Sequence, residues 1–247
     1  TRGSPLALAQ ANEVRNKLLS FNEIDPAQVK IEIIKTSGDK FLNTSLSKIG
    51  GKGLFTKEIQ QALIDKRIDI AVHSMKDVET DLPEKLVIST ILKREDVRDS
   101  FISRRYSSIA DLPLGSVVGT SSLRRRAQLL NKRKDLKVVE FRGNVQKRLE
   151  KLDNNVAVAT FLATAGLNRL GLVELINPIS TDEMLPAVAQ GAVGIEHLRS
   201  EKMEEFLGPL NDSVSKKRVE AERAFLRELD GSLSLIHISE PTRPVVI

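Results

Sequence analysis

Apolar residues in the first part of the chain follow helix and strand periods in turn. Ser4 and Pro5 are typical of a helix N-cap and first turn, and the apolar spacing after them predicts a helix that reaches Leu18. Residues 29–34 alternate as a strand does. A glycine-rich loop at residues 49–53 then leads into a second helix. The predicted buried face of that helix consists of Phe55, Ile59, Ala62 and Leu63.

The same order of elements returns in the middle of the chain. Short apolar strands are predicted at residues 68–72, 86–92, 116–118, 137–141 and 156–162. Two helices follow the third and fourth of these strands, and their apolar residues are Leu123, Ala127 and Leu130, then Val145, Leu149 and Leu152. Because both halves alternate strands and helices, we predict the α/β class, with two similar domains that each contain a largely parallel sheet.

The chain is predicted to pass between these two domains twice, near residues 94–98 and near residues 187–191. Residues 192–195 have the pattern of a strand that returns to the first sheet, so the two passages would act together as a hinge. The boundaries that follow are residues 1–95 with 190–211 for domain 1, and residues 96–189 for domain 2.

A last helix is predicted from residue 213 to residue 229, after which the pattern changes. Its predicted buried face consists of Val214, Ala221, Ala224, Phe225 and Leu229. Residues 232–247 (SLSLIHISEPTRPVVI) have no helix period and contain two prolines. We expect this tail to be too short to form a domain.

Composition excludes several classes of protein. Hydrophobic residues make up 40% of the chain and charged residues 29%, as in ordinary soluble globular proteins. Eight Phe, one Tyr and no Trp argue against a single-strand nucleic-acid binder that stacks bases on aromatic rings. The absence of Cys excludes disulfides and thiol-based metal sites and suits the cytoplasm. No apolar run approaches the roughly 18 residues that a membrane span needs.

The formal net charge is only +5, so the placement of the cations matters more than their number. They are dense at residues 124–126 and 132–134, and Arg142, Lys147 and Arg148 follow closely. Cations at the starts of predicted helices, beside Gly, Ser and Thr, favour sites for anionic groups. Solvated helix faces are the alternative interpretation, and we prefer it for Arg126.

Asp77 and His73 lie at the end of the predicted strand at residues 68–72. A carboxylate in that place can accept hydrogen bonds and move protons, although capping a following helix is the more common role of such an aspartate. For His73 we expect a hydrogen-bonded core histidine. His197 and His237 have no metal-ligand spacing with it, so we expect no metal.

Six strings of residues, in order along the chain, resemble the porphobilinogen deaminase family, also called hydroxymethylbilane synthases. They are KIGGKGLF (48–55), HSMKDV (73–78), GTSSLRRR (119–126), RGNVQKRL (142–149), AGLNRLGL (165–172) and LPAVAQGAVGIE (185–196). The resemblance implies two domains like those of type II periplasmic binding proteins, joined by hinge crossings, and a third α+β domain. Residues 212–231 would be a remnant of the third domain, and residues 232–247 are unrelated to the family.

The family implies a chemistry that suits the clustered cations. Its enzymes join four porphobilinogen units head to tail into a linear tetrapyrrole and release ammonia at each step. Every pyrrole ring carries an acetate and a propionate, so substrate and product are polyanions that need arginine and lysine donors. The family also holds a dipyrromethane cofactor.

The resemblance assigns roles to individual residues. Asp77 corresponds to the catalytic aspartate, whose carboxylate would accept pyrrole N–H bonds and stabilise developing positive charge. Residues near substrate and cofactor carboxylates would be Arg2, Ser4, Lys48, Lys52, Ser74, Lys76, Thr120, Ser121, Ser122, Arg124, Arg125, Arg142 and Arg148. The glycines at positions 50, 51 and 53 are more simply turn residues.

The chain departs from the family pattern where the cofactor should be attached. The family forms a thioether to a Cys in a Gly-Gly-Cys loop, and Leu233 stands at that position here. We therefore expect a fragment of domains 1 and 2 that lacks the covalent anchor and the third domain, binds acidic pyrroles weakly and turns over little or nothing. Two smaller departures are Val158, where an acidic residue is expected, and Ala189, where glycine is usual.

The expected partners are porphobilinogen and its linear oligomers, with no nucleic acid and no membrane, and we expect a cytoplasmic monomer. Three alternatives remain open: a hinged two-domain anion-binding module without catalysis, a nucleic-acid binder that uses the basic clusters, and a non-functional product with exposed apolar surface. The first would not need Asp77, the second would lose affinity steeply with salt, and the third would aggregate with concentration.

Overall fold

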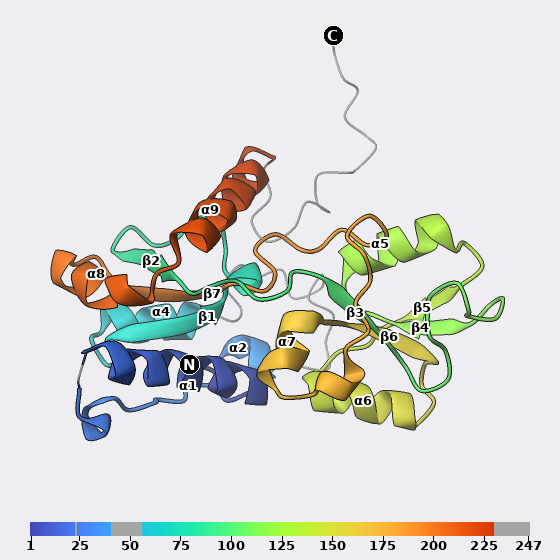
Figure 1. Ribbon diagram of the computed structural model, residues 1–247, viewed down its shortest axis with the longest axis horizontal. Coiled ribbons are helices and arrows are strands. Elements are labelled where there is room, and N and C mark those ends of the chain that lie inside the picture. Colours follow the sequence, from blue (N-terminus) through green and yellow to red (C-terminus); the bar gives the residue numbers. More distant parts are fainter. Residues whose placement is uncertain (23, 41–55, 230–247) are drawn as a thin grey trace, which may run out of the picture.

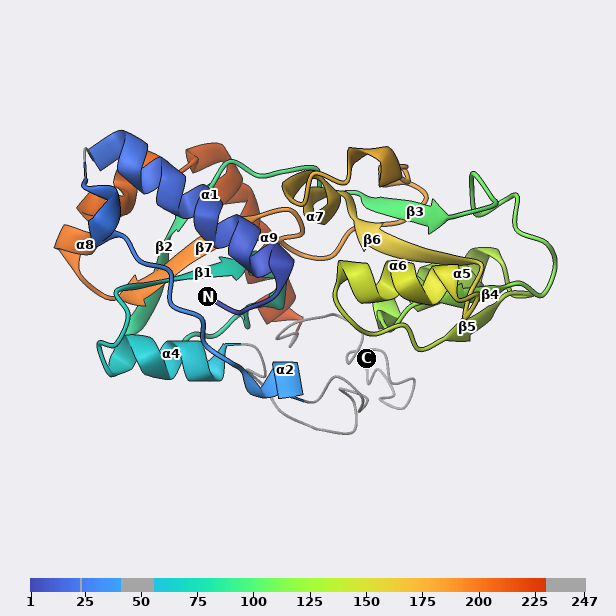
Figure 2. The same cartoon turned by 90° about the horizontal axis from the view of Figure 1, so that it is seen from below.

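The computed structural model describes residues 1–22, 24–40 and 56–229. Its strands form two sheets, one of three strands in the order β1-β7-β2 and one of four in the order β3-β6-β4-β5. Helices pack around each sheet, so the molecule has two groups of elements side by side (Figures 1 and 2). The predicted α/β class is confirmed for the described residues.

The first sheet is antiparallel, against our prediction of a largely parallel one. Its strands are β1 (Ile70–Ser74), β2 (Leu86–Ile91) and β7 (Val193–Leu198). β7 lies between the other two and runs antiparallel to both, with Ile195 opposite both Val72 and Thr90. The prediction that residues 192–195 return to the first sheet is confirmed. β7 separates two strands that run the same way, which is why the sheet is antiparallel.

Among the helices that contact this sheet are α1 (Pro5–Asn22), α4 (Lys57–Ile64) and α8 (Glu201–Leu207). Ile59, Ala62 and Leu63 of α4 are buried as predicted, whereas Phe55 lies outside the described residues. The strand predicted at residues 29–34 is wrong, because this segment forms no sheet ladder. Two hydrogen bonds hold it to the N-terminus instead: the Thr1 ammonium donates to the Glu32 carbonyl (2.9 Å), and the Ile34 N–H donates to the Thr1 carbonyl (2.9 Å).

The second sheet is parallel over three of its four strands. β4 (Val117–Gly119) is parallel to both β5 (Lys137–Val139) and β6 (Ala159–Ala163), while β3 (Asp99–Ser103) is antiparallel to β6. Its helices are α5 (Leu123–Lys132), α6 (Val145–Asp153) and α7 (Thr164–Arg169). The remaining short elements are η1 (Pro26–Gln28), α2 (Ser37–Lys40), η2 (Met75–Asp77), η3 (Val173–Leu175) and η4 (Gly208–Leu210).

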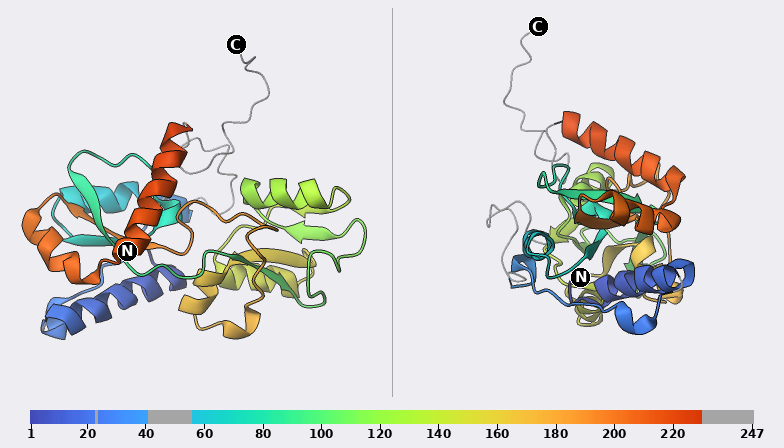
Figure 3. Two further views of the ribbon diagram at one scale, coloured as in Figure 1. Left: turned by 45° about the horizontal axis from the view of Figure 1, so that its top comes forward. Right: turned by 90° about the vertical axis from the view of Figure 1, so that its left-hand side faces the viewer.

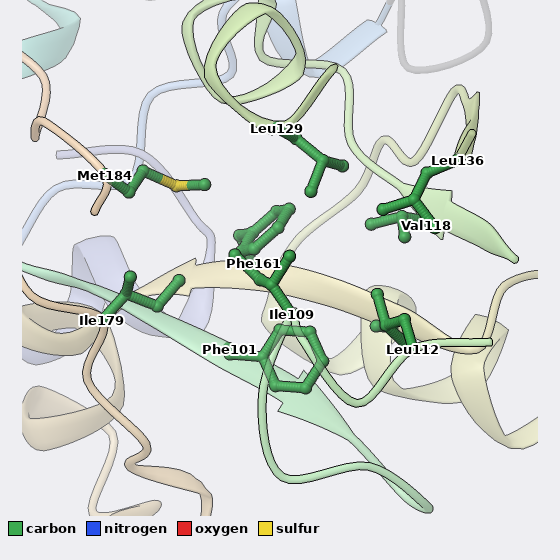
Figure 4. Packing of buried hydrophobic residues seen from close by; sticks show 10 residues of the cluster. Phe101, Ile109, Leu112, Val118, Leu129, Leu136, Phe161, Ile179 and Met184 are labelled. Atoms are coloured by element: carbon green, nitrogen blue, oxygen red, sulfur yellow. The ribbon is translucent and has the colours of Figure 1, made fainter. Parts of the chain in front are cut away.

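Packing on this sheet fixes the rotation of α5. The side chain of Leu129 points from α5 toward Phe161, which meets Phe101 edge-on with ring centroids 6.1 Å apart (Figure 4). Arg125, one helical turn before Leu129, faces the same way and is 5% exposed. The apolar residues Leu123 and Ala127 are instead exposed. The charged residue Arg125 therefore faces inward on α5, where a hydrophobic pattern would place Leu123 or Ala127.

The helix α9 (Ser213–Glu228) rises from the first group of elements and contacts β2 (Figure 3). The helix itself was predicted, but its buried face was not: the buried residues are Ser215, Val219 and Leu226. Val214 and Phe225, which were predicted to be buried, are 56% and 61% exposed. Polar contacts set this rotation, since the Arg223 guanidinium donates to the backbone carbonyls of Val78, Glu79 and Thr80.

The two predicted passages between the groups run against each other. The Gln190 side chain donates to the Val97 carbonyl (2.7 Å), and the Arg94 guanidinium donates to the Gln190 carbonyl (2.9 Å). Glu222 of α9 contacts both passages: its carboxylate pairs with Arg94 (2.5 Å) and accepts the N–H of Ala189 (2.7 Å). The two connections therefore form one hydrogen-bonded unit.

Ala189 adopts a left-handed backbone conformation, with φ of 57°. A side chain in this region strains the backbone by roughly 1–2 kcal/mol, and glycine relieves that strain. We predict that Ala189→Gly raises the free energy of unfolding by about 1 kcal/mol in urea denaturation. Ala192 is also buried but is not among the residues with positive φ, so Ala192→Gly should lower the free energy of unfolding. Equal losses in the two variants would contradict the prediction.

Candidate active site

The first part of the candidate site lies at the end of β1. The helical turn η2 follows the strand and carries Lys76 and Asp77 past the edge of the sheet. Asp77 is exposed and lines a small pocket together with Arg2, Gln10 and Ser74. The Ser74 hydroxyl lies 2.9 and 3.0 Å from the two polar atoms of the Gln10 amide, which joins β1 to α1. Asp77 is therefore placed on ordered backbone with polar neighbours.

The two histidines in the described residues are structural. His73 is buried, and its Nε2 lies 2.9 Å from Glu196 Oε2, as expected for a hydrogen-bonded core histidine. His197 donates from Nδ1 to the Leu198 carbonyl (2.7 Å), so its Nε2 accepts from the Ser89 hydroxyl (2.7 Å). His237 lies outside the described residues. Within the described ranges no three His, Cys, Asp or Glu side chains gather as metal ligands would.

The second part of the site lies where β4 ends and α5 begins. Ser122 caps α5 by accepting the N–H of Arg125 (3.4 Å), and Thr120 Oγ1 accepts the N–H of Ser122 (3.2 Å). Ser121 Oγ accepts the N–H of Phe141 (2.9 Å). A hydroxyl that accepts one hydrogen bond still has its own proton to donate. These three residues therefore order the loop and remain able to donate to an anion.

Arg124 and Arg125 share one buried carboxylate. Asp99 is 0% exposed and pairs with Arg124 Nη2 (2.7 Å) and Arg125 Nη2 (2.6 Å). Burial alone would raise the pKa of Asp99, but the two guanidinium groups outweigh it and hold the pKa well below its usual range. Arg125 Nη1 donates to the Phe161 carbonyl (2.8 Å), and Nε is buried without an acceptor in the described residues.

Two more arginines lie near the start of α6: Arg142 precedes the helix and Arg148 belongs to its first turns. Asn144 caps that helix by accepting the N–H of Lys147 (2.9 Å), and Arg148 Nε donates to the Gly143 carbonyl (2.9 Å). Burial, together with the charges of Arg125 and Arg142, lowers the pKa of Arg148 to about 10, while the charge of Asp77 opposes the shift. Within the described residues, Arg142 Nη1 is buried and has no acceptor.

Lys76 brings the two parts of the site together. Burial lowers its pKa, the Asp77 charge opposes this, and the charges of Arg125 and Arg148 add to the lowering. Groups on β1, α5 and α6 are thus close enough to interact electrostatically. We call Lys76, Arg125, Arg142 and Arg148 the cationic cluster. Such a cluster destabilises the folded protein until an anion satisfies its donors.

The remaining predicted residues have simpler surroundings or lie outside the described ranges. Ser4 Oγ accepts the N–H of Ala7 (3.3 Å) and caps α1. Arg126 is exposed, as expected for a solvated face. Lys48, Lys52 and the glycines at positions 50, 51 and 53 lie outside the described residues, and so does Leu233.

Three residues near the site were not singled out from the sequence: Asp99, Gln190 and Arg169. Arg169 pairs with Glu13 (3.0 Å), donates to the Gly191 carbonyl (3.1 Å) and has a buried Nη2 without an acceptor in the described residues. Asp99 and Gln190 lie in or beside the two passages. In the sequence, Gln190 is the polar residue of an otherwise apolar segment and Asp99 ends the charged run at residues 93–99. Both become informative only when the passages are known to meet.

Comparisons with known proteins point to one family. Residues 1–205 match a family model described as porphobilinogen deaminase, dipyromethane cofactor binding domain. The porphobilinogen deaminase of Paracoccus denitrificans is 56% identical over 234 residues, which cover 94% of this chain and 75% of that protein. The chloroplastic porphobilinogen deaminase of Pisum sativum is 56% identical over 237 residues, and the match spans 64% of its length.

A solved structure supports the predicted architecture. A periplasmic substrate-binding protein of an ABC transporter from Coxiella burnetii superposes with a TM-score of 0.50 at 12% identity, covering 94% of this chain and 96% of that one. At this identity the likeness concerns the fold alone, and it agrees with the expected binding-protein-like domains. None of the described helices has the length and apolar character needed to cross a membrane.

The lowered pKa of Arg148 predicts whether its charge raises or lowers the free energy of unfolding, and stability measurements can test this. Unfolding restores the ordinary, higher pKa, so the charged form destabilises the folded state at every pH below about 10, and this effect is relieved as the pH rises above about 10 toward the ordinary value. Arg148→Met should therefore raise the free energy of unfolding at pH 7, by about 1 kcal/mol in urea denaturation.

The matched control is Arg104→Met, because Arg104 forms an exposed pair with Asp153 (2.8 Å). Loss of such a pair should lower the free energy of unfolding by less than about 1 kcal/mol. At equal ionic strength, sulfate should raise the free energy of unfolding of the original chain more than it raises that of the Arg148→Met variant. A destabilised Arg148→Met would show that this arginine is satisfied within the protein.

Proposed function

Because the chain belongs to the porphobilinogen deaminase family, we propose that its cationic cluster binds the carboxylates of porphobilinogen and that Asp77 performs the chemistry on the pyrrole. The enzymes of this family are transferases that join four porphobilinogen units into hydroxymethylbilane for tetrapyrrole synthesis. The observation that carries the proposal is that Lys76 and Arg148, from separate elements, both lie close enough to Asp77 and to Arg125 to interact with their charges.

Porphobilinogen fits the cluster by charge. Its acetate and propionate are planar anions, and a guanidinium group binds such anions through two parallel hydrogen bonds. Arg125 Nε and Arg142 Nη1 are buried donors without acceptors in the described residues. Carboxylates would satisfy these donors and restore the pKa of Arg148 toward its ordinary value, so substrate binding removes a destabilising feature of the free protein.

Asp77 would act where positive charge develops. The carbon–nitrogen bond of the aminomethyl group breaks, ammonia leaves, and the remaining methylene-pyrrolenine is electron-poor. The carboxylate accepts the pyrrole N–H and stabilises this charge. A pyrrole carbon of the growing chain then attacks the methylene carbon, a carbon–carbon bond forms, and the proton displaced from the attacking ring is accepted by Asp77 or by solvent.

The cationic cluster also fits the dipyrromethane of the matched family, which carries carboxylates of the same kind. Lys76, Arg125, Arg142 and Arg148 would hold those carboxylates. When bound, the cofactor supplies the terminal pyrrole to which the first substrate is joined. These 247 residues contain no cysteine, and Leu233 stands at the expected attachment position. We therefore propose that this chain binds pyrroles without forming the thioether and without sustained turnover.

A hinged anion-binding module without catalysis is the second candidate. The likeness to the Coxiella burnetii periplasmic substrate-binding protein favours it, because two domains around a hinge suffice for binding. The two candidates differ at Asp77, which only the enzyme requires.

We also propose the domain division 1–95 with 190–211, 96–189, and 212–231, together with a monomeric state and a cytoplasmic location. The separate sheets and the paired passages at residues 94–98 and 187–191 support the first division.

Asp77→Asn tests the proposed function. We expect at least tenfold weaker porphobilinogen binding by calorimetry, because the amide loses the charge that would face the substrate ammonium. Ammonia release with protein in excess over substrate should fall at least a hundredfold. Asp81→Asn makes the same charge change at an exposed pair with Arg227 and should alter neither quantity. Unchanged affinity and specificity in Asp77→Asn would favour the binding module.

Lys76 gives the affinity a pH dependence. Only its protonated form attracts carboxylates, and burial lowers its pKa below the ordinary 10.5. Porphobilinogen affinity should therefore fall as the pH rises through that lowered value, earlier than for an exposed lysine. Lys76→Gln should bind more weakly at pH 7 and lose this inflection in titration calorimetry. The exposed Lys134→Gln should keep it, and an inflection that persists in Lys76→Gln would assign it to another group.

A further inference from the structure

We propose that Asp99 is a positioning residue for the anion site: its buried carboxylate holds the guanidinium group of Arg125 in a fixed orientation and couples that orientation to the hinge. The proposal extends the proposed function, since Arg125 is one of the residues suggested to bind substrate carboxylates. Nothing in the sequence motifs assigns a role to Asp99.

The first support is the number of contacts that converge on one fully buried side chain. Oδ1 of Asp99 accepts from Arg125 Nη2 (2.6 Å) and from Gln190 Nε2 (2.9 Å), and Oδ2 accepts from Arg124 Nη2 (2.7 Å). A buried carboxylate needs such partners to compensate for its lost hydration. The geometry is correspondingly restrictive, because moving any one donor leaves charge unpaired in the interior.

The second support is the way in which Arg125 is held. Nη2 bonds to Asp99, and Nη1 donates to the Phe161 carbonyl of β6 (2.8 Å). Two nitrogens of the planar fork are therefore fixed from different directions. The third, Nε, is buried and without an acceptor in the described residues. A guanidinium group that is fixed at two corners holds its Nε–H in one direction, which lowers the entropy lost when an anion binds there.

The third support is the position of Asp99 in the chain. It is the first residue of β3 and directly follows the first passage, residues 94–98. Gln190, in the second passage, donates from the same nitrogen to Asp99 and to the Val97 carbonyl (2.7 Å). The carboxylate that orients Arg125 is thus bonded to the contact between the passages. A change of hinge geometry would reach the arginine through Asp99.

A simple charge argument gives the opposite expectation. Asp99 lies among cations and lowers the local positive potential, so its removal by charge alone would strengthen the binding of a net negative ligand. The positioning role predicts that its removal weakens binding, because Arg125 loses its fixed orientation. The sign of the effect therefore separates the two explanations.

The experiment compares porphobilinogen binding to the full chain, Asp99→Asn and Asp99→Glu by calorimetry. We expect at least tenfold weaker binding in Asp99→Asn and partial recovery in Asp99→Glu. The control is Asp96→Asn, which removes the same charge three residues earlier from a pair with Arg98 and should change affinity less than twofold. Unchanged or tighter binding in a folded Asp99→Asn would overturn the proposal.

A second variant covers the case in which Asp99→Asn does not fold. Gln190→Leu keeps the carboxylate and both arginines but removes the bond from the hinge, and we expect three- to fivefold weaker binding. Affinity equal to that of the original chain would overturn the coupling to the hinge.

A readout without ligand separates this proposal from the proposed function. The Arg125 Nε–H signal in nitrogen-15 NMR should be protected from solvent exchange in the original chain and exposed in Gln190→Leu and Asp99→Asn. If the original chain does not bind porphobilinogen, the proposed function fails while this signal still decides the positioning role. An equally protected signal in all variants would overturn that role.

Discussion

The candidate site depends on keeping several positive charges close together inside the protein. Burial lowers the pKa of Lys76 and of Arg148, and the charge of Arg125 adds to the lowering of both. Mutual repulsion would separate flexible side chains on a surface. Here each cation is attached to a strand end or a helix start, and Asp99 neutralises part of the charge. The lowered pKa of Arg148 means that its charge reduces the stability of the folded protein.

The proposed hinge suits the same constraint. In our proposal the two groups of elements carry cations that repel one another, and an anionic ligand would draw the groups together. Arg125 and Arg148 belong to helices of the second group of elements, whereas Lys76 and Asp77 follow β1 of the first. Glu222, in turn, attaches α9 to both passages. The helix that follows the two groups is therefore in contact with the segments about which they would move.

Sequence reasoning was most successful where chemistry is local. Ser4 caps α1 as its position beside Pro5 predicted, and the two passages between the groups lie where the strand pattern placed them. It was least successful with side-chain direction. The predicted buried face of α9 was wrong, and Arg125 lies on the inward side of α5, because Arg125 and Arg223 reach inward to carboxylate and carbonyl acceptors that lie far away in the sequence. A hydrophobic pattern contains no information about such acceptors.

The sequence by itself determined the order of the elements, the return of the chain to the first sheet and the residue types suited to acidic pyrroles, because these depend on local pattern and motif. Only the tertiary structure decided that β7 makes the first sheet antiparallel, that residues 29–34 pair with Thr1 and that Asp99 holds Arg125. Each of these depends on groups that meet only after folding. Asp99 and Arg125 are 26 residues apart, and neither reveals its partner until β3 and α5 pack together.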